Sequence, residues 1–522
     1  MNPKTLVPLA SALLVATLAL APVRCPGQGA LTPPGPPAPT MKSLDQIEPR
    51  IPILSLPIVI TNSGSYYLTT NLTGVSGYNG ITILTNNVTL DLRGFTLFGA
   101  PGAQSGIWVP GNTVSFALKN GTVRDWPFSG VDADESFDSQ FSQLSLENNG
   151  ADGLRPGADS VIDHCIADGN AYEGFGGNNG YECTFDACTA ENNGDAGFFT
   201  YSRCRLFNCD ANDNVNDGFD LDFQCTAKNC TAGFNGAAGV DINYIGCLAD
   251  DCVCDDDDVG FLVGDHSVAV NCAATHNTDD GINSLPGSTI QSSIAGWNGG
   301  YGIDASNDCV VTGCTADTNQ LDNIITGSGC TLDHCSAGYS RAGNGFTLGA
   351  GSTLSASSAL GNATCGIAAG GRTTIHDCTA SFNGSAGIQI SVLDTVRDCS
   401  CVNNGLYGIL ENNNGDSVIQ QNNCSYNGTL AYSGAITTGA GIFVTNSAGC
   451  RIEGNTVDFN YAGLVVAPLN QALILRNSAD ANVATNFVLG AGNSWGPIVN
   501  VTAGGDISTI PNSSHPGANF IH

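Results

Sequence analysis

The sequence has little positive charge. It contains 16 Lys and Arg residues against 47 Asp and Glu residues, which gives a net charge of -31. Nucleic-acid-binding proteins hold phosphates with clustered Lys and Arg, so we expect no nucleic acid partner. Polyanionic sugars would be repelled too, and a polyuronate would need bridging divalent cations. Calcium is therefore the single candidate cofactor, and we otherwise expect none.

Long apolar runs are missing after the first residues. Lys4 precedes the run "LVPLASALLVATLALA", which contains Ala19 and Ala21 at a small-residue cleavage pattern, so residues 1–28 are predicted to be a secretory signal. The Pro-rich residues 29–44 predict a stiff linker. No later segment is long and apolar enough to cross a membrane. We expect a secreted or cell-surface monomer whose mature chain has no transmembrane segment.

Leucine-rich and helical repeat patterns are also missing, but another repeat is clear. Pairs of Gly and an apolar residue recur mostly every 21 residues between Gly153 and Gly408, with Asn323 in place of one Gly. Each repeat has three pairs of apolar residues two apart, which predicts three short strands and no helix. The fold class predicted is all-β, a single-stranded parallel β-solenoid of about 18 coils with about 21 residues per coil. We expect an N-terminal cap over residues 45–78, the β-helix over 79–490 and a C-terminal cap over 491–522.

Cysteine and asparagine recur at fixed places in this repeat. Residues one repeat apart lie above one another in a solenoid, so each kind is expected to form a vertical file inside the coil. Asn accepts left-handed turn geometry, and stacked Asn side chains hydrogen-bond along the file, so the Asn file is predicted to be a turn ladder. The Asn file includes Asn214, Asn235, Asn277, Asn298 and Asn319. The Cys file contains Cys165, Cys188, Cys209, Cys230, Cys252, Cys272, Cys314, Cys335, Cys378, Cys399 and Cys424.

The state of these thiols follows from the spacing of coils. Export favours disulfides. Neighbouring coils, however, lie about 4.8 Å apart, whereas a relaxed disulfide needs Cβ atoms about 3.8 Å apart. We therefore expect mostly reduced, buried thiols that pack as small apolar groups. Some inter-coil disulfides are the alternative, and metal ligation is least favoured because the core offers an ion no access path or mixed ligand set.

Three quoted segments carry a family resemblance. The repeat "NG..GI...CTA", the segment "IPILSLPIVITNSGSYYLTTNLTG" and the segment "NSWGPIVNVTAGGDI" resemble the secreted right-handed parallel β-helix repeat proteins of environmental bacteria, in the pectate-lyase-like superfamily. The resemblance covers residues 45–522 and implies a right-handed coil. The superfamily includes pectate lyases, polygalacturonases, alginate-modifying enzymes and many members of unknown role, so the fold alone implies no activity.

Two catalytic patterns of that superfamily find no full match. The stretch "HNTDDGIN", from His276 to Asn283, resembles a polygalacturonase carboxylate motif, but no "GHG" or "RIK" accompanies it. A lyase would need an Arg beside a carboxylate set that binds calcium. The sequence scatters its candidate arginines among coils without matching carboxylates, and the catalytic residues are unknown at this stage. Those arginines are Arg155, Arg203, Arg205, Arg341 and Arg372.

A better candidate site lies on the outward face of the first strand of each repeat. The candidate substrate- or cation-binding residues there are Asp220, Asp222, Asp241, Asn243 and Asp304. Asp220 and Asp241 are expected about 5 Å apart on successive coils, close enough to share a cation or to raise a pKa. The simpler interpretation is a solvated acidic strip. The run from Asp255 to Asp258 is interpreted as a solubilising loop.

Threonines suggest another class of function. They recur at two outward positions, where regular ladders would present a flat surface to ice or to crystalline polysaccharide, although Thr also simply favours strands. The first file includes Thr226, Thr289, Thr331, Thr353, Thr374 and Thr395, and the second Thr189, Thr231, Thr315 and Thr379.

The function predicted first is an exported rod that acts as an extracellular scaffold or glycan-binding protein without a catalytic motif. The alternative is a polysaccharide lyase or glycoside hydrolase, assisted by calcium, and a second alternative is ice or crystalline-surface binding. The expected partner is an extracellular polysaccharide or a cell-surface component. An enzyme is expected to gather carboxylates, Arg and aromatic residues on adjacent coils, whereas a scaffold is expected to have an even surface.

Overall fold

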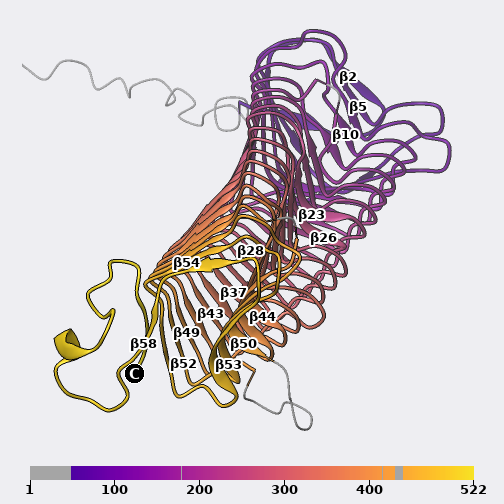
Figure 1. Ribbon diagram of the computed structural model, residues 1–522. Coiled ribbons are helices and arrows are strands. Elements are labelled where there is room, and N and C mark those ends of the chain that lie inside the picture. The colour runs from indigo at the N-terminus through magenta and orange to yellow at the C-terminus, as the bar shows by residue number, and fades with distance from the viewer. Residues whose placement is uncertain (1–48, 178, 414, 429–438) are drawn as a thin grey trace, which may run out of the picture. The chain divides into compact units, whose positions relative to one another are not determined.

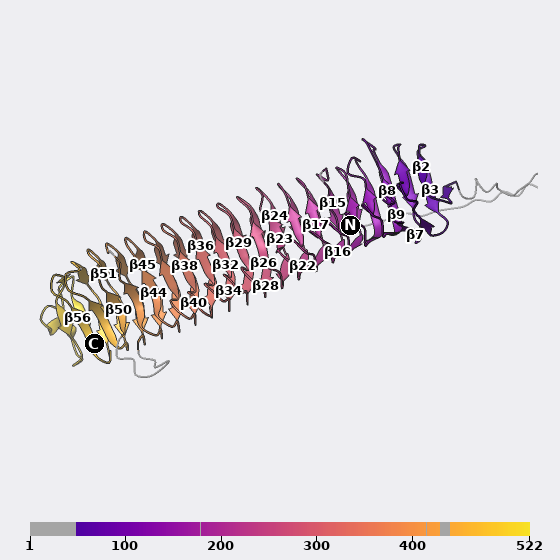
Figure 2. The same ribbon diagram turned by 90° about the vertical axis from the view of Figure 1, so that its right-hand side faces the viewer.

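The computed structural model describes residues 49–177, 179–413, 415–428 and 439–522. Residues 50–522 form one compact unit of stacked coils (Figures 1 and 2). The predicted signal and linker, residues 1–44, lie outside the described residues. Within the described ranges no helix is long and apolar enough to span a membrane.

Each central coil contains three short strands, as the repeat predicts. One coil holds β20 (Phe219–Leu221), β21 (Thr226–Lys228) and β22 (Thr231–Gly233). In β20 the first and third side chains are buried and the second is half-buried, because alternate residues of a strand point to opposite faces. Strands of successive coils pair in parallel, as β20 does with β23 (Ala238–Ile242). The all-β parallel solenoid is confirmed.

The solenoid has about 22 turns and not the 18 expected. Some of the additional coils are N-terminal. In the segment expected to be a cap, β1 (Ile51–Ile53) pairs in parallel with β3 (Gly64–Leu68), which pairs with β6 (Val88–Asp91). These coils lack the Gly and Cys markers of the repeat, which is why the periodicity did not reveal them.

The recurring Gly is explained by close packing. At Gly281 a Cβ atom would lie 2.5 Å from Asn298 Nδ2 and 2.7 Å from the carbonyl oxygen of Gly302. Nearly the same contacts recur at other members of this series of glycines, such as Gly366. We call the series the Gly file. The Gly position is therefore fixed by the absence of room for a side chain, and not by a left-handed backbone.

The Asn file is a continuous hydrogen-bonded ladder. Asn214 Nδ2 donates to Asn235 Oδ1 at 3.0 Å, and Asn298 Nδ2 donates to Asn319 Oδ1 at 2.9 Å. Most of these amides also donate to a main-chain carbonyl, as Asn214 Nδ2 does to that of Ala190 at 3.2 Å. All these side chains are buried, so the ladder satisfies main-chain groups that water does not reach. The predicted turn ladder is confirmed.

In the coil of Ser340 the ladder Asn is missing, and a neighbouring substitution restores the connection. Ser340 stands where an Asn is expected, and Asn323 stands where the preceding Gly is expected. Asn323 Oδ1 accepts from Asn319 Nδ2 at 2.9 Å, and Asn323 Nδ2 donates to Asn362 Oδ1 at 2.9 Å. The unusual Asn323 in the Gly file thus bridges the gap left by Ser340.

Asp257 corrects one expectation. The run from Asp255 to Asp258 was expected to be a solubilising loop, but Asp257 is 1% exposed and occupies the ladder between Asn235 and Asn277. Its Oδ1 accepts from Asn235 Nδ2 at 2.9 Å, while its Oδ2 is buried with no hydrogen-bond partner. Burial raises the pKa of Asp257 to about 7, since a charged carboxylate is poorly solvated there.

The cysteines of the described chain are all buried and free, in line with the predicted reduced core. They also hydrogen-bond: Cys314 Sγ donates to the carbonyl oxygens of Ile290 and Thr312 at 3.5 Å each. One assignment was wrong, because Cys424 pairs in register with Cys401, which lies two residues after the file member Cys399, and so does not belong to the expected Cys file. The insertion of two residues in this coil shifted the alignment.

Candidate functional site

The outward face of one sheet carries an uneven set of side chains. On this face β8 (Ile107–Trp108) pairs with β10 (Val131–Asp132), which pairs with β12 (Leu154–Arg155). Further along, β17 (Phe198–Thr200) pairs with β20 and β20 with β23. In each strand the neighbours on both sides of the outward residue, where present, are buried. The outward residues of these strands are Trp108, Asp132, Arg155, Phe199, Asp220 and Asp241.

Arg155 lies between carboxylates from two coils. Its Nη2 is 3.3 Å from Asp134 Oδ2, and its Nε is 3.2 Å from Asp152 Oδ2. The three side chains are between 11% and 26% exposed, so water screens these ion pairs less than it screens pairs on an open surface. The sequence analysis did not pair Arg155 with any carboxylate, so these two contacts are findings of the structure. Asp152 directly precedes the Gly file, a place that the outward-face pattern did not include.

Asp152 has an unusual acidity. The pKa of Asp152 is raised to about 8, chiefly by burial and also by a hydrogen bond with Glu173 and by its negative charge, while Arg155 acts in the opposite direction. The raised pKa favours the protonated form of Asp152 near neutral pH. We call Asp132, Asp134, Asp152, Glu173, Asp220 and Asp241, together with Arg155, the carboxylate face.

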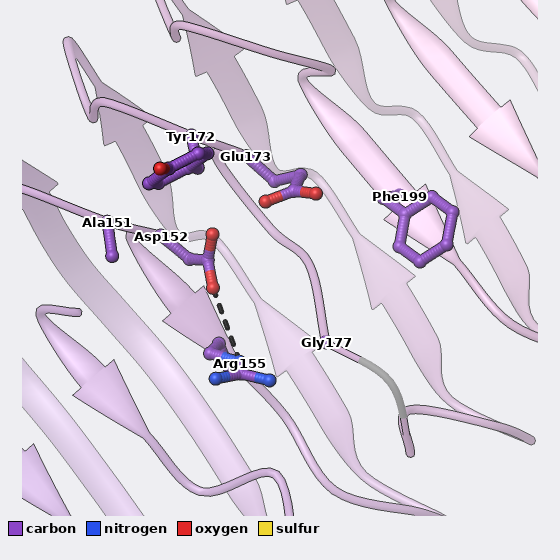
Figure 3. A pocket seen from close by; sticks show the side chains of 7 residues that line it. All are labelled: Ala151, Asp152, Arg155, Tyr172, Glu173, Gly177 and Phe199. Carbon is purple, nitrogen blue, oxygen red and sulfur yellow. Dashed lines mark ion pairs between the residues drawn. The ribbon is translucent and has the colours of Figure 1, made fainter. Parts of the chain in front are cut away.

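A cavity of about 280 Å³ opens on the carboxylate face (Figure 3). Asp152 and Glu173 lie on one side of it, Arg155 below them and the ring of Phe199 on the other side. Gly177 also lines the cavity, and a Cβ atom there would lie 2.9 Å from Asp134 Oδ1, so the main chain passes close to this carboxylate. The cavity offers an acid, a guanidinium group and an aromatic ring to one ligand.

A second cavity lies nearby on the same sheet. It measures about 270 Å³ and is lined by Trp108, Phe128 and Asp132, among others. Phe128 is 56% exposed and Trp108 38% exposed, while burial raises the pKa of Asp132. Since Asp132 is the register neighbour of both Trp108 and Arg155, the two cavities are adjacent along the column of coils.

The sequence-predicted site residues are only partly brought together. Asp220 and Asp241 are register neighbours, and burial raises the pKa of Asp220 to about 7 and that of Asp241 to about 6. Asp222, expected to point outward, is 8% exposed, because it follows β20 at the bend of the coil. Asn243 is exposed, and its N–H donates to Asp241 Oδ1 at 2.7 Å. Asp304 lies three coils beyond Asp241, apart from this group.

The pattern reading missed Asp132, Asp134, Asp152 and Glu173. A signal for them was available, because the segment "GFGGNNG" that follows Glu173 contains two extra glycines where other coils carry side chains. Such glycines mark a place where a ligand or backbone approaches closely.

The described residues include no group of three or more His, Cys, Asp or Glu side chains placed to hold a metal ion. The two predicted Thr files are present but interrupted. Thr331, Thr353, Thr374 and Thr395 stack in register, whereas Val310 occupies the same place in the coil before them.

The sequence profile described as "Right handed beta helix region" matches residues 79–227 and 287–424, together more than half of the chain. No curated protein sequence matches. Among solved structures, the A-module of mannuronan C-5 epimerase AlgE6 of Azotobacter vinelandii is similar, with 15% identity, 74% of this chain and 91% of that chain covered, and a TM-score of 0.24.

Two further structures are similar to this chain. A mutant of the periplasmic alginate epimerase AlgG shares 11% identity over 70% of this chain and 76% of that chain, with a TM-score of 0.30. A double mutant of the tailspike protein of E. coli bacteriophage HK620, in complex with a pentasaccharide, shares 13% identity over 74% of this chain and 73% of that chain, with a TM-score of 0.33. These similarities assign no chemistry to this chain.

Proposed function

The chain belongs to the right-handed β-helix family, and on this scaffold we propose that the carboxylate face binds a polysaccharide. The observation that carries the proposal is the gathering of Arg155, Asp152, Glu173, Phe199 and Trp108 on a few adjacent coils, beside two cavities. An even scaffold surface would not concentrate them. We further propose that the protein acts outside the cell, where the N-terminal signal pattern would direct it.

The side chains of the carboxylate face suit a sugar chain. Carboxyl and guanidinium groups hydrogen-bond hydroxyl groups, and aromatic rings such as those of Phe199 and Trp108 stack on the apolar faces of sugar rings. The two adjacent cavities accommodate successive units of a chain laid along the column. The net charge favours a neutral polysaccharide, and a polyuronate would bind only with calcium between its carboxylates and those of the protein.

The test is binding to a polysaccharide array, with and without calcium, of the native protein and of Arg155→Gln and Phe199→Ala. We expect retention of at least one polysaccharide. Since hydrogen bonds to a charged group contribute about 1.5–3 kcal/mol, Arg155→Gln should weaken its affinity by about tenfold or more.

The matched control is Arg397→Gln. Arg397 forms an ion pair too, with Asp398 at 3.0 Å, but it lies on β45 (Thr395–Arg397) of the other sheet. This variant should bind as the native protein does. Absence of binding to every polysaccharide, or equal loss with the control, would refute the proposal.

The acidity of Asp152 favours a second candidate function, cleavage of the bound polysaccharide. A carboxyl group with a pKa of about 8 is a proton donor at neutral pH. Asp152 and Glu173 are within hydrogen-bonding reach of each other, too close to flank a glycosidic bond as the paired carboxylates of most glycoside hydrolases do, about 5 Å or more apart. In this candidate, Asp152 acts as the acid beside Arg155, without Glu173 as the opposing group.

Cleavage is tested by reducing-sugar release and by the ultraviolet absorbance of unsaturated products. Because the acid form of Asp152 disappears above its pKa of about 8, the rate should fall as the pH rises above that value. Asp152→Asn should abolish turnover while the polysaccharide still binds. Turnover that survives Asp152→Asn would exclude Asp152 as the acid and leave the binding function standing.

A further inference from the structure

Beyond Phe199, the carboxylate face continues into a group of aspartates that has no positive side chain beside it. Asp220 is the register neighbour of both Phe199 and Asp241, and Asp222 follows at the bend after β20. Among the described residues, no ion pair includes any of these three aspartates, whereas Arg155 pairs with two of the carboxylates around it. The negative charge of this group is therefore not balanced within the described part of the chain.

Asp222 is the least accessible of the three. It is 8% exposed, and its carboxylate accepts no hydrogen bond from the described residues, nor does that of Asp220. Asp241 accepts one, from the N–H of Asn243 at 2.7 Å. Burial raises the pKa of all three groups, since their charged forms are poorly solvated. Buried polar groups in native proteins are almost always hydrogen-bonded, so these free acceptors indicate a ligand that supplies donors.

Two exposed aromatic rings accompany these carboxylates. Phe223 is 45% exposed and Tyr244 41%, and their ring centroids are 4.7 Å apart. The negative charge of Asp222 raises the pKa of Tyr244, and the charges of Asp220 and Asp241 act in the same direction, so all three carboxylates lie near this phenol group. We call Asp220, Asp222, Asp241, Phe223 and Tyr244 the aspartate–aromatic cluster.

The cation that suits this cluster is organic. The side chains described by the structure include no group of three or more His, Cys, Asp or Glu that converges to hold a metal ion. An ammonium group carries three N–H donors, so it can donate to two carboxylates that lie about 4.8 Å apart on successive coils. Aromatic ring faces attract the same charge. If a sugar carries the ammonium group, the apolar face of its ring also stacks on an exposed aromatic ring.

We propose that the aspartate–aromatic cluster binds the ammonium groups of an amino-sugar polysaccharide, one whose amino groups are not acetylated. This inference rests on the proposed function and names the class of polysaccharide, because Asp220 and Asp241 belong to the carboxylate face. A chain held beside Phe199, at the first cavity, reaches Asp220 in the next coil. The net charge of -31 attracts a polycation. A sugar chain without positive charge would leave these carboxylates without a counter-charge.

The test is calorimetric titration, near neutral pH, with a β-1,4-linked glucosamine oligosaccharide and with its fully N-acetylated counterpart, which has no positive charge. The native protein should bind the free amine about tenfold more tightly or better, since hydrogen bonds between charged groups are the strong ones. The combined variant Asp220→Asn and Asp241→Asn should bind both oligosaccharides alike. Because it removes the repulsion between two neighbouring carboxylates, this variant should melt at or above the native temperature.

The matched control is Asp163→Asn combined with Asp186→Asn. These residues are register neighbours on β13 (Val161–Asp163) and β15 (Thr184–Asp186) of the other sheet, and each has a partner, His164 at 2.7 Å and Asn208 at 2.9 Å. The control removes the same charge and should keep the preference for the free amine.

Four results would overturn the inference. They are equal binding of the two oligosaccharides by the native protein, an equal loss of preference in the control, binding of oligolysine as tight as that of the glucosamine chain, and displacement of that chain by calcium but not by sodium at equal ionic strength. Each of them leaves the proposed function to its own test, because binding of an uncharged polysaccharide through Arg155 and Phe199 does not depend on an ammonium group.

Discussion

Single residues show that the cysteines are more than small apolar fillers. Cys330 Sγ donates to the carbonyl oxygen of Ser306 at 3.0 Å, and Ser288, at the equivalent place two coils earlier, donates through Oγ to the carbonyl oxygen of Gly264 at 2.7 Å. Cys and Ser thus exchange at one bend of the coil because both bond a main-chain carbonyl. Composition predicted the buried thiols but not this hydrogen bond, which depends on where the bend places the carbonyl.

Asp257 yields a prediction at the residue scale. Its pKa is about 7 when folded and about 3.8 when unfolded, so the folded state binds the proton more tightly. Its contribution is therefore fully present below pH 4 and is lost as the pH rises to 7. Asp257→Asn restores the ladder donor and does not titrate. The variant should be more stable than the native protein at pH 8, by up to about 4 kcal/mol, and the difference should shrink towards pH 4.

Urea unfolding at pH 5 and pH 8 measures this difference. Asn277→Asp, which places a second carboxyl group next in the ladder, should act in the opposite direction and destabilise the protein more at pH 8 than at pH 5. A stability difference for Asp257→Asn that does not change with pH would show that the buried carboxyl group does not titrate in this range.

The site was predictable to the extent that it follows the repeat. Asp220 and Asp241 are one repeat apart on outward positions, and their adjacency was predicted correctly. Asp152 and Arg155 were not combined, since their contact depends on side-chain direction around the Gly file. Periodicity specifies which residues stack above one another, but it does not specify which side chains at neighbouring repeat positions contact each other.

At the scale of the coil, the Gly file sets a steric limit. Gly281→Ala should destabilise the protein by about 1–3 kcal/mol, because the added methyl group overlaps the ladder amide of Asn298 and the next main chain. Gly296→Ala, in the strand that leads to the same turn, is the matched control, since its nearest contact would be 3.4 Å. Thermal melting should show a clear loss for the first variant and a change within about 0.5 kcal/mol for the second. Equal losses would remove the packing explanation for the file.

The strands themselves were predictable because each repeat has three places where apolar residues alternate with other residues. Few folds other than a β-solenoid fit that pattern. The prediction failed at the N-terminal coils, where β1 and β3 carry ordinary β-branched and aromatic residues without markers. A coil needs only inward apolar residues and parallel pairing, so it can continue after its recognisable sequence has stopped.

For the molecule as a whole, the buried thiols predict chemical inertness. All described cysteines are buried, so a disulfide reagent does not reach their sulfur atoms while the chain is folded. The described cysteines should not react with such a reagent in the native protein and should all react after unfolding, and a reductant should not change the melting temperature. Rapid labelling of the native protein, or a melting temperature that falls on reduction, would contradict a fully reduced and closed core.

The bridge made by Asn323 has a consequence for how such a chain grows. Asn323 and Ser340 are each out of place in their own columns, and only together do they keep the amide chain connected at this point. Recombination that duplicates or removes one coil between them would separate the two changes and leave an orphaned amide in the interior. Near this point, a duplication of coils is therefore tolerated only if the duplicated segment carries both Asn323 and Ser340. The alternative is a segment that has Gly and Asn at these two positions, as most repeats do.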